Sequence, residues 1–596
     1  MKSDNYKITQ YSVSSILGYV ENSQIAIPEI QRPFVWKGEE VRALIDSLYE
    51  GYPIGYLIVW QNSQVRVRGF GKGGTKKILI DGQQRVTALM AALLGKEVLD
   101  EQYQSHRIRI AFNPLAQSGE ERFAVCDEKH ENDARWISDI SIFFKRDFSF
   151  RQFEKEYKEA NPGEDFTSLE ESVDTLKEIT KHQVGVIELS FLLDIDVVSE
   201  IFIRINLQGK PLNQEDFVMS KISVNEQYGG DYIRNCIDYF CHLLREPSFY
   251  QVLQQNETEF FNSEYGQAVA WCRNKEESLY IPSYADVLKV VLIAYFGKIR
   301  IGDMVHLLSG RTGDKKGFAK KEVSKKLSEE SFKKLDLGVK AFVCEKNFNG
   351  FQKALKKAGY CCTRLLYSQS VLNYCYAMYL LMDRQGISEE EKESLIGRWI
   401  TMAMLTGHYQ NSAESTVLKD YSNAQEEGFA SYLKQLEELK LTEEFYNNIL
   451  PDKFTSTTAR TAPFLAYIAT QCAKGVHSLY SEVTIEELYK NKTESYQILP
   501  KAYLAKCGYK TRETYGQVAN LTYISKEAKD IVKKKSPAEY KEILEDHIGK
   551  DAITASLKEN NLTEEIFAAG EKEVPDILAQ RRNQMSLEIK TFYETL

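Results

Sequence analysis

The stretch Ile78–Arg85 reads ILIDGQQR, and it decides the fold class of the first part of the chain. Its apolar start predicts a buried strand, and Val86–Leu94 has the apolar spacing of a helix that Gly95 closes. Another predicted strand, Tyr56–Trp60, follows an amphipathic helix. This alternation of short strands and helices predicts an α/β or α+β domain.

The predicted turn between this strand and helix can bind an anion. The first N–H groups of a helix have no partners within the helix and carry partial positive charge, and Gly82 allows a ligand close to the backbone. Arg85 can form paired hydrogen bonds to phosphate. Asp81 could hold Mg²⁺ or orient a water, and Gln83 and Gln84 could bind a nucleotide or that water. The structural alternative is that Asp81 caps the helix and Arg85 forms a salt bridge.

Two further stretches combine charged, amide and aromatic residues. Ile27–Trp36 reads IPEIQRPFVW, in which an arginine can bind a phosphate and the aromatic rings can stack on a base. Phe202–Leu212 reads FIRINLQGKPL and exposes an arginine and amides between two predicted helices. Each has a structural alternative, namely a proline-braced loop that packs Phe34 and Trp36 in the core, and an ordinary joint between helices.

The composition is that of a soluble globular protein. The chain has 596 residues, of which 43% are hydrophobic and 27% charged, and this length predicts roughly two to four domains. The net charge of −9 argues against a surface coated for non-specific nucleic-acid binding but allows a local basic groove. The 10 cysteines contain no C-x-x-C pair, and neither a signal peptide nor a membrane span is visible. These features predict a cytoplasmic protein.

Several common catalytic patterns are absent from the sequence. Gly69–Gly74 formally matches G-x-G-x-x-G, but it precedes a predicted strand and is interpreted as a hairpin turn. There is no Walker A motif, and none of the 8 histidines has a spacing typical of metal ligands. A zinc enzyme is therefore disfavoured.

The rest of the chain is predicted to be mostly helical. The expected domains are 1–217, a helical region 218–487, a small mixed segment 488–550 and a tail 551–596. The lysine-rich stretch Lys315–Lys334 is predicted as a solvated helix face, with a nucleic-acid contact as the alternative. The last helix, Val574–Leu596, carries Arg581 and Arg582, predicted as surface residues or interdomain ion pairs.

Taken together and in this order, the three stretches resemble the amino-terminal domain of GmrSD-type modification-dependent restriction proteins. That domain is similar to the ParB and sulfiredoxin nucleotide-binding fold. The resemblance implies that the stretch from Asp81 to Arg85 binds and hydrolyses a nucleoside triphosphate with Mg²⁺ on Asp81, and that the other stretches line the same pocket. The implied catalytic residues are Asp81, Gln83 and Gln84, and the implied nucleotide-binding residues are Gln31, Arg32, Gly82, Arg85, Arg204 and Asn206.

Many relatives carry a second domain, an HNH nuclease of the ββα-metal kind, and the end of this chain resembles it in outline. Glu494–Lys501 (ESYQILPK), Val518–Thr522 (VANLT) and Lys535–Pro537 (KSP) occupy its three sequence elements. The resemblance implies an α+β chain with a ParB-like domain, a helical middle and a small HNH-like domain.

The catalytic residues of that nuclease are missing. Tyr496 and Gln497 stand where two histidines belong, Lys529 stands where an asparagine belongs, and Asn520 remains. An HNH site needs an imidazole to activate water and ligands for one divalent cation. We therefore expect the nuclease site to be degenerate.

These observations predict a cytoplasmic, restriction-like defence protein that binds and hydrolyses a triphosphate and senses DNA. A partner protein would supply the nuclease, membranes are not expected as partners, and a homo-oligomer is compatible with the sequence. The alternative is a non-catalytic nucleic-acid-binding or scaffold protein that uses the nucleotide as a conformational switch. A third interpretation keeps nuclease activity through other ligands, such as Glu494 and Asp530.

Overall fold

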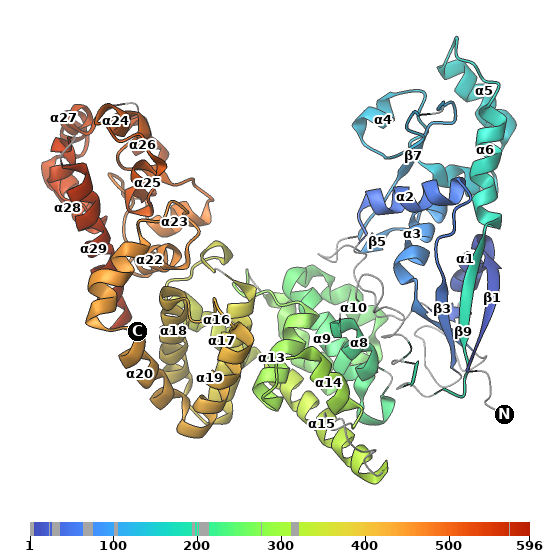
Figure 1. Ribbon diagram of the computed structural model, residues 1–596, viewed down its shortest axis with the longest axis horizontal. Coiled ribbons are helices and arrows are strands. Elements are labelled where there is room, and N and C mark those ends of the chain that lie inside the picture. The colour runs from blue at the N-terminus through green and yellow to red at the C-terminus, as the bar shows by residue number, and fades with distance from the viewer. Residues whose placement is uncertain are drawn as a thin grey trace. The chain divides into compact units, whose positions relative to one another are not determined.

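The computed structural model of the chain describes residues 5–22, 24–26, 36–62, 76–99, 105–117, 119–193, 197–198, 201, 214–223, 225–275, 277–310, 321–366, 368–533, 535–570 and 573–596. The chain divides into two compact units, Met1–Glu226 and Gln227–Leu596. The first combines a sheet with helices, and the described part of the second is mainly helical (Figure 1). The predicted mixed α/β class with a helical carboxy-terminal region is confirmed. The ParB-like and HNH-like folds and the finer domain boundaries stay predictions.

A five-stranded sheet forms the centre of the first unit. Its strand order is β1-β9-β3-β4-β2. β9 pairs antiparallel with β1 and parallel with β3, while β4 pairs antiparallel with β3 and parallel with β2. The strands are β1 (Tyr6–Ser12), β2 (Ile25–Ala26), β3 (Leu57–Asn62), β4 (Lys76–Asp81) and β9 (Gln183–Leu189).

The two faces of this sheet carry different apolar clusters because alternate residues of a strand point to opposite faces. Leu57, Val59 and Leu79 join the main core with three helices, α1 (Val13–Glu21), α2 (Gly38–Tyr49) and α3 (Gln83–Leu94). Their neighbours along the strands, such as Ile58 and Ile78, form a smaller cluster on the other face. The main core therefore fixes the position of α3 against β4, where the first candidate site lies.

Smaller elements complete the first unit. Two short hairpins pair β5 with β6 and β7 with β8. The further strands and α-helices among the described residues of this unit are β5 (Val98–Leu99), β6 (Ser105–His106), β7 (Ile110–Phe112), β8 (Phe123–Val125), α4 (Glu128–Asn132), α5 (Phe150–Ala160), α6 (Leu169–Glu178) and α8 (Gln214–Ser223).

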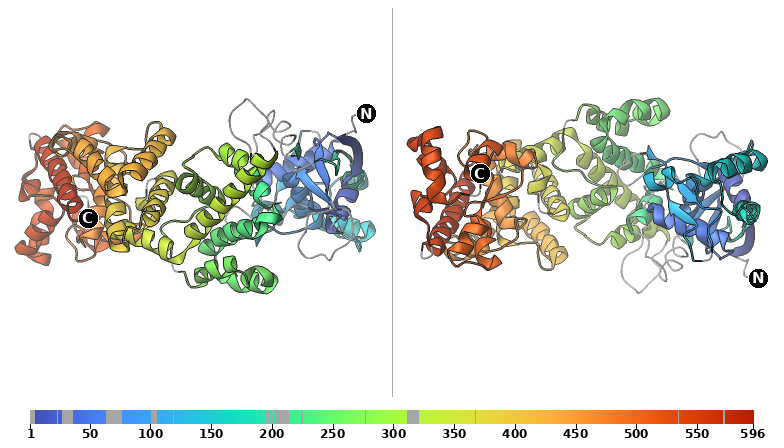
Figure 2. Two further views of the ribbon diagram at one scale, coloured as in Figure 1. Left: turned by 90° about the horizontal axis from the view of Figure 1, so that it is seen from below. Right: turned by 90° about the horizontal axis from the view of Figure 1, so that it is seen from above.

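Packed helices build the second unit (Figure 2). α13 packs against α15 and α17, α16 against α18, and α22 against α29. Its described strands are β10 (Tyr496–Gln497) and β11 (Leu521–Thr522), which pair antiparallel. None of the described helices has the length and apolar character needed to cross a membrane. The helices are α9 (Gly230–Arg245), α10 (Tyr250–Asn256), α11 (Thr258–Phe261), α12 (Glu264–Val269), α13 (Tyr284–Phe296), α14 (Ile301–Leu308), α15 (Lys321–Val343), α16 (Glu345–Lys357), α17 (Gln369–Arg384), α18 (Glu389–Thr406), α19 (Ala413–Glu427), α20 (Phe429–Lys440), α21 (Leu450–Lys453), α22 (Ala462–Ala473), α23 (Ile485–Lys490), α24 (Lys501–Lys506), α25 (Arg512–Tyr515), α26 (Lys526–Val532), α27 (Pro537–Ile548), α28 (Lys550–Glu559) and α29 (Val574–Tyr593).

The prediction that Arg581 is a surface residue or an interdomain ion pair is wrong. Its side chain is 1% exposed, and its guanidinium donates to the backbone carbonyls of Ala519, Leu521 and Asn560. All of these residues belong to the second unit. Arg581 therefore connects α29 to the β11 region through hydrogen bonds in the interior of the unit. These bonds matter because buried carbonyls are normally paired with a donor.

Candidate functional site

The junction between β4 and α3 is built around Gly82. This residue is the N-cap of α3 and has φ of +96°, a conformation that favours glycine. A Cβ atom at this position would also collide with Cδ2 of Leu57 on β3. Only glycine therefore allows the chain to turn from β4 into α3 so close to β3. The first N–H groups of α3, which have no partners within the helix, lie at this turn.

Arg85 and Asp81 form an ion pair across this turn. Nη2 of Arg85 donates to Oδ2 of Asp81 at 2.9 Å, and Nη1 donates to the carbonyl of Ile54 at 2.9 Å. The side chain of Arg85 is 18% exposed and that of Asp81 is 25% exposed. Burial lowers the pKa of Arg85, and the charge of Asp81 acts against that shift. The pair matches the salt bridge of the structural alternative and places a guanidinium and a carboxylate together at the helix start.

Gly55 makes room for this arginine from the other side. Gly55 has φ of +84°, and a Cβ atom there would lie 2.8 Å from Nη1 of Arg85. Two glycines from separate segments therefore flank one guanidinium. The contact between Gly55 and Arg85 could not be predicted from the ILIDGQQR stretch, because Gly55 lies 30 positions before Arg85 in the sequence.

The two glutamines after Gly82 occupy the first turn of α3. Nε2 of Gln83 donates to the carbonyl of Leu79 at 3.2 Å, and Gln84 is partly buried. Asp81, Gly82, Gln83, Gln84 and Arg85 are therefore brought together at one turn. Gln31, Arg32, Arg204 and Asn206 lie outside the described residues. Within the described part of the chain, no group of three or more His, Cys, Asp or Glu is placed to hold a metal ion, and Asp81 as a Mg²⁺ ligand stays a prediction.

Residues 13–223 match the family model described as the GmrSD restriction endonuclease, N-terminal domain. This segment is similar to that domain. The match covers about a third of the chain, nearly all of the first unit, and includes all three stretches singled out in the sequence. A comparison with curated proteins found no match.

The GmrSD-type N-terminal domain contains a second polar cluster that sequence patterns did not indicate. Glu188 on β9 accepts hydrogen bonds from Lys77 on β4 at 2.6 Å, from Lys7 on β1 at 2.9 Å and from the hydroxyl of Tyr11. Its carboxylate is 5% exposed. Burial by itself would raise the pKa of Glu188, but these hydrogen bonds outweigh it and lower the pKa from 4.5 to about 2. The cluster links three strands of the sheet.

We expect the acid stability of the GmrSD-type domain to depend on Glu188. Because its pKa is lower in the folded state than in the unfolded chain, Glu188 stabilises the fold above pH of about 4.5, and this contribution is lost as the pH falls toward 2. Glu188→Gln should remove on the order of 2 kcal/mol at neutral pH and flatten the pH dependence across that window. Urea unfolding at a series of pH values, with hydrogen exchange of β9 peptides as the local readout, measures both effects.

The matched control for this prediction is Glu178→Gln in the same domain. Glu178 pairs with Lys181, and its side chain is 58% exposed. An exposed pair contributes little, so this variant should unfold like the unmodified protein at every pH. Equal changes in the two variants would contradict the role given to the buried cluster.

The four residues of the degenerate nuclease prediction lie in the second unit, three of them in or next to β10 and β11 and the fourth on α26. Tyr496 and Gln497 form β10 and pair with Thr522 and Leu521 of β11. Asn520 immediately precedes β11 and is completely buried, whereas Lys529 lies exposed on α26.

Side chains around β10 and β11 bond mainly to the backbone. Oδ1 of Asn520 accepts from the N–H of Leu499 at 2.9 Å, and its Nδ2 donates to the carbonyls of Leu499 and Tyr515. Oε1 of Gln497 accepts from the N–H of Lys501 at 3.1 Å, at the start of α24. Asn520 and Gln497 thus hold the backbone of this region in place.

Proposed function

We propose that this chain is a restriction-like defence protein whose amino-terminal domain binds and hydrolyses a nucleoside triphosphate in response to DNA. The observation that carries the proposal is the turn at Gly82, where helix N–H groups, the Arg85 guanidinium and the Asp81 carboxylate meet within a GmrSD-type domain. A helix start with an adjacent arginine suits phosphate oxygens.

Each residue of the turn has a role in this proposal. Arg85 is already held by the Ile54 carbonyl, so its guanidinium is positioned before a phosphate arrives. A phosphate that also binds the Arg85 guanidinium would weaken its ion pair with Asp81 and leave the Asp81 carboxylate able to bind another group. The oxygen chemistry of Asp81 fits Mg²⁺, which is commonly held by one or two carboxylates plus substrate phosphates and would neutralise phosphate charge. Gln83 keeps its amide oxygen available to orient a water, because its Nε2 bonds Leu79.

Two further roles belong to this proposal. Gln84, together with Gln31, Arg32, Arg204 and Asn206 from the other two stretches, would complete the nucleotide pocket. The side-chain amides of Gln497 and Asn520 form hydrogen bonds with backbone groups and would not serve as catalytic groups. A partner chain would therefore supply the nuclease that acts with this protein. A cytoplasmic location fits such a DNA-directed role.

The scaffold alternative is supported by the ion pair between Arg85 and Asp81. In this alternative, a bound triphosphate breaks the pair and changes the conformation of the turn without being hydrolysed. Phosphate release from the full chain, measured with and without DNA, separates turnover from a switch that only binds.

We expect Arg85→Ala to weaken triphosphate binding about 10- to 100-fold, the effect of losing one charge-assisted hydrogen bond. Asp81→Asn, which preserves the shape of the side chain, should reduce phosphate release more than it reduces binding. Isothermal titration calorimetry with each common triphosphate and Mg²⁺ measures the binding, and a phosphate-release assay measures the turnover.

The control is Arg107→Ala beyond the other end of α3. Arg107 also pairs with an aspartate, Asp139, at 2.6 Å, and its guanidinium also lies close to a glycine, Gly95. This variant should bind triphosphate normally. The proposal fails if the unmodified protein gives neither heat nor a thermal shift with any of the triphosphates.

A further inference from the structure

Three ionisable side chains contact one another in a row where α18, α19 and α20 meet in the second unit. Nζ of Lys440 lies within hydrogen-bond distance of Nδ1 of His408, and Nε2 of His408 lies 2.8 Å from Oδ2 of Asp420. His408 follows the end of α18, Asp420 lies on α19, and Lys440 is the last residue of α20. Three separate elements therefore bring an amine, an imidazole and a carboxylate together in that order.

The two contacts of His408 fix which ring nitrogen carries the proton. A lysine ammonium can only donate, so Nδ1 of His408 accepts from Lys440 and Nε2 donates its proton to Asp420. The side chain of His408 is 5% exposed and that of Asp420 is 2% exposed. The other carboxylate oxygen of Asp420 accepts from the hydroxyl of Tyr432 at 2.8 Å. An aspartate in this position stabilises the imidazolium that forms when the histidine takes up a proton.

Two aromatic rings hold the imidazole in this orientation. The ring centroid of His408 lies 5.8 Å from that of Trp399 and 4.7 Å from that of Tyr409, and both pairs meet edge to face. Trp399 and Tyr409 are buried. Because packing and hydrogen bonds both restrain the ring, Nδ1 of His408 stays next to the amine of Lys440.

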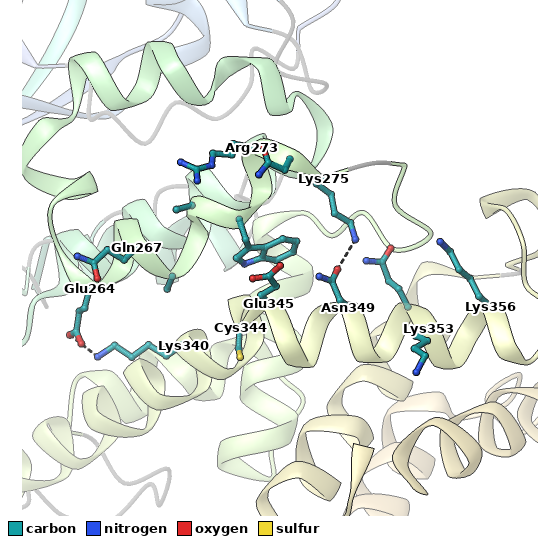
Figure 3. Close-up of a pocket in the computed structure, with 15 residues that line it drawn as sticks. Glu264, Gln267, Arg273, Lys275, Lys340, Cys344, Glu345, Asn349, Lys353 and Lys356 are labelled. Carbon is teal, nitrogen blue, oxygen red and sulfur yellow. Dashed lines mark hydrogen bonds and ion pairs between the residues drawn. The ribbon is translucent and has the colours of Figure 1, made fainter. Parts of the chain in front are cut away.

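The partner of Lys440 is unusual for a lysine side chain. Lys340, by contrast, pairs with the carboxylate of Glu264 at 2.7 Å (Figure 3). The described partner of Lys440 is a base, the imidazole of His408. Burial lowers the pKa of Lys440, and the charge of Asp420 acts against that shift. Part of the Lys440 side chain remains exposed, so a small molecule in solution can reach the amine.

This arrangement can turn the lysine into a nucleophile. An ammonium group has to lose its proton before its nitrogen can attack another atom, and an imidazole can take that proton at neutral pH. Here Nδ1 of His408 would receive the proton of Lys440, while Asp420 holds the imidazole in the required tautomer. A nucleophile, a base and a group that orients the base are the parts by which enzymes activate nucleophiles.

We propose that Lys440 is a modification site that takes an acyl group from a compact donor, an acyl phosphate. Nζ forms a bond to the acyl carbon, and the bond from that carbon to the phosphate oxygen breaks with its electron pair on the oxygen. One proton of the ammonium passes to His408 and on to solvent, and the second leaves with the phosphate. The product is an uncharged amide, so Asp420 loses the positive charge on the far side of His408. The inference goes beyond the proposed function and uses none of the residues at the Gly82 turn.

The test incubates the full chain with acetyl phosphate and follows acetylation of each lysine by quantitative peptide mass spectrometry. Lys453 is the internal reference, because it is also partly exposed and burial also lowers its pKa. Its Nζ donates to the carbonyl of Leu405 at 2.8 Å, which cannot act as a base. Lys440 should react at least about tenfold faster than Lys453, since a general base contributes about 10²- to 10⁴-fold. Equal rates in the unmodified protein would overturn the inference.

Variants of the other two groups test their roles. His408→Gln removes the base but keeps an acceptor for Lys440, so the rate at Lys440 should fall to about that of Lys453. Asp420→Asn should also lower the rate at Lys440, and Asp420→Glu should restore part of it, because Asp420 acts by positioning His408. Lys453 should react equally in all these proteins, and urea unfolding checks that each is folded. An unchanged rate at Lys440 in His408→Gln would contradict the proposed base.

A second donor, acetyl-coenzyme A, tests whether the acyl group comes from an acyl phosphate or from a thioester. Lys346, whose side chain is 68% exposed, serves as the accessible reference. The rate at Lys440 relative to that at Lys346 should fall when the bulky thioester replaces acetyl phosphate, because the Lys440 amine is partly buried. A rise in this ratio would overturn the assignment of a compact donor.

Discussion

Replacing Arg581 by alanine should lower the free energy of unfolding of the second unit by roughly 3–5 kcal/mol. The substitution leaves the carbonyls of Ala519, Leu521 and Asn560 without this donor and opens a cavity beside α29. The side chain of Arg581 is 1% exposed, and this burial lowers the pKa of its guanidinium, while the nearby Tyr467 acts against that shift. Urea unfolding, with hydrogen exchange of peptides from β11 and α29, measures the loss.

The neighbouring residue offers a matched control. Arg582 donates to Oε1 of Gln517 at 2.7 Å, a side-chain partner rather than a set of backbone carbonyls. Arg582→Ala should therefore cost about 1 kcal/mol. If the two alanine variants lose the same stability, the stabilising role assigned to the hydrogen bonds of Arg581 with the backbone is wrong.

The purified chain by itself should leave DNA uncut, with or without Mg²⁺ or Mn²⁺ and with each triphosphate. Hydrolysis of a phosphodiester needs an activated water and a metal that stabilises charge on the phosphate. Gln497 has no basic nitrogen and already bonds the N–H of Lys501. Burial raises the pKa of Tyr496, so its phenolate form is scarcer still at neutral pH. Loss of the general base alone costs about 10²- to 10⁴-fold in rate.

The remaining asparagine cannot compensate for that loss. Asn520 is fully buried, and both ends of its amide bond backbone groups of the same region. If Lys529 occupied a metal-ligand position, as the resemblance to HNH nucleases implies, its positive charge would repel the cation. The contrary interpretation assigns metal ligands to Glu494 and Asp530, both exposed.

The assay for cutting uses plain and modified DNA, and it includes two variants that should fold normally because both side chains are exposed. Cutting that disappears in Glu494→Ala or Asp530→Ala, but persists in Arg85→Ala, would show that a working nuclease survives in this chain. If plain and modified DNA both remain uncut in every mixture, the result supports a partner protein as the source of cleavage.

The turn at Gly82 shows how much of the structure the local sequence predicts in this protein. The strand, Gly82, the helix and its end at Gly95 could all be predicted, because strand burial, helix periodicity and glycine at positive φ act within a few residues. Asp81 and Arg85 are four positions apart, so their ion pair is also a local feature. The family match agrees with the motifs because they lie within residues 13–223.

Arg581 marks the limit of that local information. Its place on the apolar face of the last helix, between Ile577 and Met585, was visible in the sequence and could have indicated burial. What it bonds was not visible, since the carbonyls of Ala519 and Leu521 lie about 60 positions earlier.

Only the tertiary structure decided which distant residues share a site. Glu188 meets Lys77 and Tyr11 across 111 and 177 positions of sequence, and Arg85 meets Ile54 across 31. Lys275 likewise meets Asn349 on α16 across 74 positions. Periodicity and capping are set by neighbours along the chain, whereas the partner of a buried charge is set by which segments the core packs together, and that packing depends on the whole unit.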